Sequence, residues 1–300
     1  MKTLVFISAA LALLLLANFF APAVAQDSLK DNTPTFYHLV PGTYVNGWPR
    51  FTIHYPKEWV ERIGRPEEAF KATVPGPVPF PGLTVPIGPN PAHIPLDKFG
   101  DMILPFYRTN FQDVTIVSDE PYQLRDRTLA REVEVKMVLN GSPLAVLNLG
   151  TIRNDVWCFT AIWSPLNGKI GDDLRAVAHS FEFQPGFDEP VKVPPDIQAF
   201  LDKMNEDVLS HDIKKVMSHY SDRFLHSGVR KGEAEQRFKQ LIGSTTSAKA
   251  VVTEFVPAGD RANLTGFLTS NLGRFPMGGT SMIKENGEWK LYGNQRDALP

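Results

Sequence analysis

The side chains best suited to acid–base chemistry lie close together in the last third of the chain. His219, Asp222 and His226 fall within one short segment, and Tyr292 and Asn294 follow near the C-terminal end. A histidine or carboxylate that removes a proton must lie within hydrogen-bonding distance of its substrate. The weak catalytic candidates are therefore His226 or Asp222 as base, with Tyr292 as hydrogen-bond donor.

Each of these residues also has an ordinary structural role open to it. Asp222 can cap a turn or pair with Arg223 or Arg230, and His226 can lie on the surface beside Ser227. The histidines of this segment do not have a compact metal-ligand spacing, and no cysteine accompanies them. We therefore predict no metal and no cofactor, and we leave the catalytic roles open.

Motifs of the common hydrolytic and nucleotide-dependent enzymes are missing from the sequence. It contains no G-x-S-x-G, G-x-x-x-x-G-K-[ST] or G-x-G-x-x-G segment. Cys158, the one cysteine, lies in an apolar run between Trp157 and Phe159, which predicts a small buried thiol and not a thiolate. These features favour a protein that is not an enzyme.

Charge and cysteine content exclude two further classes. The chain has 31 Lys and Arg against 33 Asp and Glu, a formal net charge of −2, without the basic cluster that nucleic acid binding requires. A single cysteine also excludes an internal disulfide, so the fold must be held together by burial of apolar side chains.

The N-terminal segment has the pattern of a secretory signal peptide. Lys2 precedes an apolar run from Leu4 to Phe20, and Ala23 and Ala25 form an A-x-A cleavage site. We expect residues 1–25 to be removed after Ala25, which gives a periplasmic or secreted protein with no integral membrane segment. An uncleaved anchor helix is the alternative, because the run is just long enough to span a bilayer.

A proline-rich stretch at residues 185–195 divides the rest of the chain. We predict an N-terminal extension at 26–43, a first domain at 44–184 and a second domain at 196–296. The predicted fold class is α+β: an antiparallel-sheet α/β/α sandwich followed by a cone-shaped domain of helices and a curved sheet.

Strand patterns dominate the first domain. Alternating apolar residues predict strands at 51–55 and 133–139, and then at 144–149 and 156–164 beyond turns at Asn140-Gly141 and Asn154-Asp155. Helical spacing appears at 99–106, where Pro105 should kink or end the helix, and at 174–178. Eight prolines between Pro75 and Pro95 predict a loop or sheet edge there, not an interior strand.

The order of these elements resembles the PsbP-like α/β/α sandwich. The resemblance rests on an opening strand that ends in Tyr55-Pro56-x-x-Trp59, then the proline-rich segment, a helix, a three-strand meander and a last helix that runs into Ser180-Phe-Glu-Phe183. It implies a role in binding or assembly with other proteins, without a shared set of catalytic residues.

Helical periodicity begins again at Pro195. Three helices are predicted near 195–208, 213–220 and 232–242, with Ser210 or Asp212 able to cap the second. Four strands follow at 250–256, 262–269, 280–284 and 288–294, the last two joined at Asn286-Gly287. Helices followed by a meander imply a curved antiparallel sheet that closes over them.

This second domain resembles the nuclear transport factor 2-like, or SnoaL-like, family. The resemblance rests on Tyr220-Ser-Asp-Arg-Phe224, on Gly232 with Phe238, and on the terminal hairpin from Lys284 to Gln295. It implies a conical fold around an apolar pocket. The residues expected to line that pocket are Phe200, Met204, Tyr220, Phe224, His226, Trp289, Tyr292 and Asn294.

The same resemblance argues against catalysis. In the steroid-isomerase branch the basic Asp lies eight residues after the tyrosine that matches Tyr220, and Gly228 occupies that position here. We therefore favour non-enzymatic binding of a small apolar ligand, or assembly as a homodimer through the C-terminal sheet or with another exported protein. A lyase or isomerase acting on a small hydrophobic substrate is the alternative.

Overall fold

A computed structural model describes residues 42–62, 64, 68–76, 80–165, 169–226, 228–277 and 280–294. The predicted signal peptide with its cleavage site lies outside this part of the chain, and so do 26–41 of the predicted extension and 295–296 of the predicted second domain. Among the residues described, no helix is long and apolar enough to cross a membrane.

The described residues separate into two compact units. The first comprises residues 53–62 and the described part of 67–182, and the second comprises the described parts of 28–52, 63–66 and 183–300. Residues 44–52, which we predicted at the start of the first domain, group with the second unit. Both units contain helices and β-sheet, which confirms the predicted α+β class. The boundaries 44–184 and 196–296 stay predictions.

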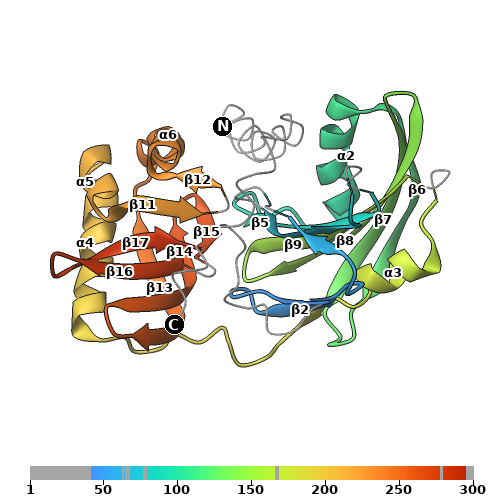
Figure 1. Ribbon diagram of the computed structural model, residues 1–300. Helices are drawn as coiled ribbons and strands as arrows, with labels where there is room; N and C mark the ends of the chain where they lie inside the picture. Colours follow the sequence, from blue (N-terminus) through green and yellow to red (C-terminus); the bar gives the residue numbers. More distant parts are fainter. Residues whose placement is uncertain are drawn as a thin grey trace. The chain divides into compact units, whose positions relative to one another are not determined.

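The first unit is built on an antiparallel seven-stranded sheet with the order β3-β4-β5-β9-β8-β7-β6 (Figure 1). Its strands are β3 (Val60–Glu61), β4 (Glu68–Thr73), β5 (Gly82–Pro89), β6 (Gln112–Gln123), β7 (Leu129–Leu139), β8 (Ser142–Arg153) and β9 (Val156–Ser164). A separate three-stranded sheet, most of whose residues group with the second unit, has the order β1-β2-β10, from β1 (Thr43–Val45), β2 (Phe51–His54) and β10 (Glu182–Phe183). The turns predicted at Asn140-Gly141 and Asn154-Asp155 are confirmed, because all four residues have the positive φ that such turns need.

Helices cover both faces of the large sheet (Figure 1). The short 3-10 turn η2 (Leu96–Lys98) leads into α2 (Phe99–Asn110), which packs on the face that carries Val133 and Val135 of β7. On the opposite face, Arg175 of α3 (Asp172–Ala178) forms ion pairs with Glu132 and Glu134 of the same strand. The alternation along β7 therefore decides which helix packs on which face.

One proline-based prediction for this unit was wrong, and of the two outcomes predicted for Pro105, a kink or an end of its helix, the second does not occur. The segment between Pro75 and Pro95 contains β5, an interior strand between β4 and β9. Pro86 fits there because it lies opposite Glu68, beside an irregularity in the β4 pairing, and a bulge does not require its missing N–H group. Pro105 also does not end its helix, since α2 continues to Asn110.

The second unit places three helices and seven strands around one core. The helices are α4 (Pro195–Leu209), α5 (Ile213–Ser218) and α6 (Lys231–Ile242). The strands are β11 (Tyr220–His226), β12 (Val229–Arg230), β13 (Ala248–Ala258), β14 (Arg261–Ser270), β15 (Gly273–Pro276), β16 (Thr280–Glu285) and β17 (Glu288–Gly293). Their order is β12-β11-β17-β16-β14-β13, with β15 paired to β14.

The helices and strands predicted for this unit are present, but β11, β12 and β15 were not among the predicted strands. Asp212 caps α5 by accepting a hydrogen bond from the Lys214 backbone, and Asn286-Gly287 has the positive φ of a tight turn. The sheet is not purely antiparallel, because β11 joins it parallel to β17. The periodicity of 220–226 was too short for us to predict this strand as part of the sheet.

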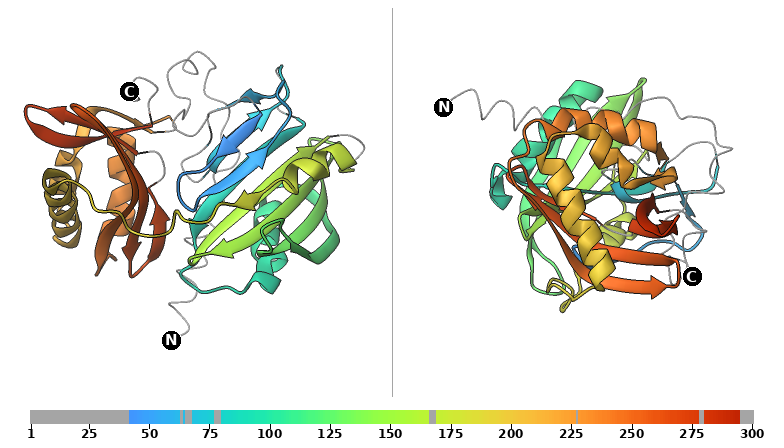
Figure 2. Two further views of the ribbon diagram at one scale, coloured as in Figure 1. Left: turned by 90° about the horizontal axis from the view of Figure 1, so that it is seen from below. Right: turned by 90° about the vertical axis from the view of Figure 1, so that its left-hand side faces the viewer.

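The core of the second unit lies between its helices and one face of its sheet. Figure 2 shows the two longer helices, α4 in yellow and α6 in orange, on the same side of the sheet. Ile197 and Leu201 of α4 meet Leu264 of β14, Met282 of β16 and Leu291 of β17 in one buried cluster. We call this the helix side of the sheet and the opposite side its outer face.

Candidate functional site

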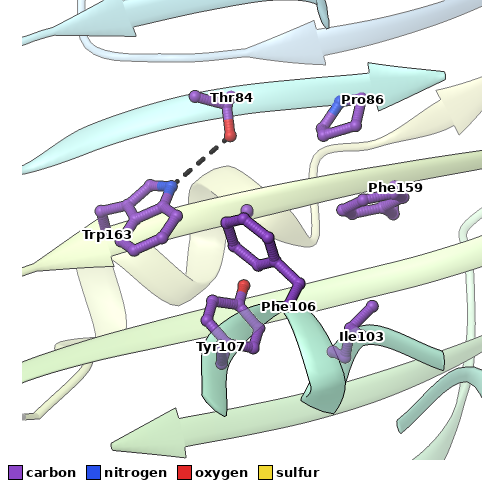
Figure 3. Close-up of a pocket in the computed structure, with 8 residues that line it drawn as sticks. Thr84, Pro86, Ile103, Phe106, Tyr107, Phe159 and Trp163 are labelled. Carbon is purple, nitrogen blue, oxygen red and sulfur yellow. Dashed lines mark hydrogen bonds between the residues drawn. The ribbon is translucent and has the colours of Figure 1, made fainter. Parts of the chain in front are cut away.

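A small crevice in the first unit lies between α2 and the strands β5 and β9 (Figure 3). It has room for one water-sized sphere, with a volume of about 10 Å³. Its lining is Thr84, Pro86, Ile103, Phe106, Tyr107, Phe159, Ala161 and Trp163. All of these side chains are buried in the described structure.

Simple periodicities bring these side chains together. Thr84 and Pro86 alternate along β5, and Phe159, Ala161 and Trp163 alternate along β9, so each strand turns one row of residues toward α2. Three residues of one helical face of α2 complete the wall, at 103, 106 and 107. The small Ala161 between two large aromatic residues leaves the space open.

The polar groups of the crevice are already hydrogen-bonded. The indole nitrogen of Trp163 donates to the Thr84 hydroxyl at 3.5 Å, a weak bond that Figure 3 shows as a dashed line. The Tyr107 hydroxyl donates to Asn148 at 2.6 Å, and burial raises the pKa of this phenol above its usual value despite that bond. No charged residue is among the eight lining residues. The crevice therefore suits an apolar group and offers no proton-transfer group at neutral pH.

The lone cysteine has the environment that the sequence predicts. Cys158 is fully buried in β9, and burial raises the pKa of its thiol well above the usual value. A thiol that stays protonated at physiological pH is not a nucleophile.

Asp222 does not point into a cavity. Its side chain is 95% exposed and forms an ion pair of 2.7 Å with Lys231 of α6, not with Arg223 or Arg230. The hydrogen bond and the charge of Lys231 lower the pKa of the carboxyl. Asp222 is therefore a solvated, paired carboxylate at the surface.

His226 lies on an extended strand and stacks on Phe224, as expected if this segment is extended. The two rings are 6.4 Å apart with 11° between their planes. The histidine is half-buried, and burial lowers the pKa of its imidazole to about 4. A neutral imidazole of such low pKa is a weak base at pH 7.

The other predicted pocket residues fall into two groups. Phe200, Tyr220 and Phe224 belong to the helix-side core, with Met204 and Trp289 packed against it. Trp289 also donates its indole N–H to Asp196 at 2.8 Å. In contrast, Tyr292 lies apart from that core, beside Ile283, and the backbone N–H of Asn294 donates to Leu225 on the neighbouring strand. The structure therefore does not bring all eight residues around one space.

Sequence reasoning missed a buried pair in this unit. Nε2 of His219 lies 2.8 Å from Oδ2 of Asp207, and the side chains are only 10% and 6% exposed. Burial raises the pKa of Asp207, but hydrogen bonds to His219 and Lys203 outweigh it, and the pKa is lowered. The signal was present, because Asp207 lies seven residues after Phe200, on the apolar stripe of α4.

The Asp207–His219 pair joins three elements of the fold. Asp207 belongs to α4, His219 ends α5 and packs edge-on against Phe200, and the His219 carbonyl accepts a hydrogen bond from Leu291 of β17. This arrangement assigns the pair a structural role. Among the described residues, no cluster of His, Cys, Asp and Glu can hold a metal ion.

Comparisons with known proteins give distant structural likenesses only. The sequence matches no protein-family model and no curated protein. The structure is similar to cyanobacterial PsbP (CyanoP) from Synechocystis sp. PCC 6803, with a TM-score of 0.40 and 14% identity, over 48% of this chain and 94% of that one.

Two further solved structures are similar at lower scores. One is a protein from Bacteroides thetaiotaomicron VPI-5482, with a TM-score of 0.32 and 11% identity, over 80% of this chain and 85% of that one. The other is Bd1075 of Bdellovibrio bacteriovorus, with a TM-score of 0.29 and 13% identity, over 62% of this chain and 92% of that one. Because all three TM-scores lie below 0.5, these likenesses assign neither a family nor a function.

Proposed function

We propose that this chain is an exported, non-enzymatic binding protein whose first unit holds a small apolar group in the crevice between α2 and strands β5 and β9. The composition of the crevice carries this proposal. Its wall is aromatic and aliphatic, its polar groups are bonded to one another or to Asn148, and it contains no charged side chain.

The size of the crevice limits the ligand. A crevice of about 10 Å³ accepts no more than one methyl-sized group. The ligand class that fits is therefore a molecule with an alkyl end, whose remainder stays outside the crevice. Transfer of a methylene group from water into such a site contributes about 0.8 kcal/mol.

The lyase or isomerase alternative has less support. Its two candidate bases are an exposed carboxylate paired with Lys231 and a histidine whose pKa is lowered to about 4. Membership of the nuclear transport factor 2-like family is part of the proposal, supported by helices packed on one face of a sheet around a common core. The same resemblance supports homodimer formation through that sheet, or assembly with another exported protein, as part of the proposal.

Export is tested separately from binding. The signal-peptide pattern supports cleavage after Ala25 and a periplasmic or secreted location. Protein recovered outside the cytoplasm of a bacterial expression host should begin at Gln26 when its N-terminus is sequenced. An intact N-terminus at Met1 would contradict cleavage, and recovery only from the cytoplasm would contradict export.

Binding is tested with xenon, which fits a methyl-sized apolar space. The full chain should show a saturable xenon-dependent change in the NMR signals of residues that line the crevice. Ala161→Val fills the space with two methyl groups and should abolish that change. Ala145→Val is the matched control, because Ala145 is equally buried but does not line the crevice.

The two variants also separate binding from folding. Each overpacks a buried site and should cost about 1–3 kcal/mol of stability. Xenon effects that persist in Ala161→Val, or that disappear equally in both variants, would contradict the proposed site. As a second probe, hexanol should raise the thermal stability of the wild type and of Ala145→Val more than that of Ala161→Val.

A further inference from the structure

Four residues of neighbouring strands form a patch on the outer face of the second unit's sheet. Arg261 of β14 lies opposite Ile283 of β16, and Asn263 lies opposite Ser281. The residues between them, at 262 and 282, belong to the helix-side core, so the four side chains leave the opposite face. We call these four residues, with the adjacent Tyr292, the arginine patch.

Two buried donor groups of this patch have no acceptor. Asn263 is 1% exposed, and its amide Nδ2 has no hydrogen-bond partner within the described part of the chain. Nη1 of Arg261 is also buried without a partner there. Ser281 donates to Oδ1 of Asn263 at 2.6 Å, so the NH₂ group is the end of this amide that has no partner among the described residues. Buried donors of this kind are rare in proteins and each requires an explanation.

Among the described residues, one positive charge of the patch has no ion-pair partner. Arg223 lies over the Tyr292 ring, 5.3 Å from its centroid, and forms an ion pair of 3.1 Å with Glu285. Arg261 lies 5.7 Å from the centroid of the same ring, and no ion pair involves it among the residues described. At this distance the aromatic ring compensates a guanidinium charge only partly. Within the described residues, the patch therefore holds one guanidinium nitrogen and one amide nitrogen without an acceptor.

We propose that the arginine patch binds the carboxylate group of a small organic acid. Nη1 of Arg261 and Nδ2 of Asn263 each donate to one carboxylate oxygen, a pattern that guanidinium and amide donors suit. Ile283 and Tyr292, which form a buried apolar pair, receive the body of the acid. The Arg223 side chain is 60% exposed, so the edge of the patch is open to solvent.

Charge favours a carboxylate over a phosphate. A carboxylate carries one negative charge and matches the one uncompensated guanidinium. A phosphate carries close to two charges at neutral pH and would add repulsion with Glu285, which lies on the strand that also supplies Ser281 and Ile283. The site is independent of the alkyl crevice, which belongs to the other unit.

Benzoate is the probe, with benzamide and inorganic phosphate as comparisons at equal ionic strength. Benzoate should raise the melting temperature of the full chain saturably and give a binding isotherm in calorimetry, whereas the neutral benzamide and phosphate should do neither. A phosphate effect as large as that of benzoate would overturn the carboxylate assignment. No benzoate effect beyond that of sodium chloride would overturn the site.

Variants of the patch locate the effect. Arg261→Gln should weaken benzoate binding about tenfold or more, because it removes a charge-assisted hydrogen bond. Asn263→Asp keeps the acceptor for Ser281 but replaces the donor with a negative charge, so it should abolish binding even if the first variant is unstable. Arg237→Gln, an exposed arginine of α6, is the control and should bind as the wild type does.

Arg261→Met distinguishes a ligand site from a structural arginine. The thermal stability of this variant without ligand should rise, since it removes an unpaired buried donor and charge, while benzoate should no longer raise it further. A lower melting temperature without ligand would show that Arg261 serves the fold and would overturn the proposal.

Discussion

Two pairs of polar residues lie on opposite sides of the second unit's sheet and differ in whether their buried polar atoms have partners. On the helix side, Asp207 and His219 bond to each other at 2.8 Å. On the outer face, Arg261 and Asn263 each keep a buried donor atom for which the described residues supply no acceptor. Burial of an unpaired donor costs about 1–3 kcal/mol, whereas a paired donor recovers that cost. The first pair therefore serves the fold, and the second is left for a ligand.

An unpaired donor alone does not identify a site. The first unit also has buried atoms without a partner among the described residues, Nε1 of Trp157 and Oγ1 of Thr160. Neither carries a charge, and each neighbours apolar residues of β9. The arginine patch differs because two donors, one of them charged, leave the same face of one strand.

Of the changes considered, His219→Ala should have the largest effect. It should lower the free energy of unfolding by about 3 kcal/mol. Removal of the histidine leaves the Asp207 carboxylate buried without it, and the loss of one partner of a buried ion pair typically costs about 3–5 kcal/mol. Because Lys203 still contacts Asp207, we expect a loss near the lower end of this range. Urea unfolding measures it. A loss well under 1 kcal/mol would show that the pair does not hold α4 to α5, and His219→Gln, which can still donate to Asp207, should lose less.

The elements of the second unit were more predictable than its polar residues. Apolar spacing along α4 and turn residues such as Asn286-Gly287 predict local structure, because both depend on a few neighbouring residues. The parallel pairing of β11 with β17 depends on strands more than sixty residues apart, so no local pattern shows it. In the first unit, the same limitation applied to β5, where a bulge in the pairing accommodates Pro86.

The candidate sites were less predictable still. The crevice needs α2, β5 and β9 together, and we had predicted a loop or sheet edge in place of β5. Asp222, one of the residues considered for catalysis, is a surface carboxylate. It forms an ion pair with Lys231, whereas the predicted partners were Arg223 or Arg230. Arg261 and Asn263 carry no sequence signal at all, because an arginine and an asparagine in an alternating strand are typical of a solvent-facing row.

Titration of His226 should have a smaller effect, which appears as a dependence of the free energy of unfolding on pH. In the unfolded chain its pKa is about 6.5, whereas burial lowers it to about 4 in the folded unit. Between these values the unfolded chain binds the proton and the folded chain does not. Stability is therefore complete above about pH 6.5 and falls as the pH is lowered toward 4. Since His226 is only half-buried, we expect a loss of about 1–2 kcal/mol.

The pH range in which stability is lost distinguishes His226 from Asp207. The pKa of Asp207 is lowered by its partners, so its contribution is lost only when the pH falls through that folded value, below the ordinary value of about 3.9. Urea unfolding at about pH 7 and about pH 4.5 therefore reports on His226 and not on Asp207. His226→Gln should reduce the difference between the two conditions, whereas His54→Gln, at an exposed position of the first unit, should leave it unchanged. An equal pH dependence in wild type and His226→Gln would mean that the imidazole is solvated in the folded chain.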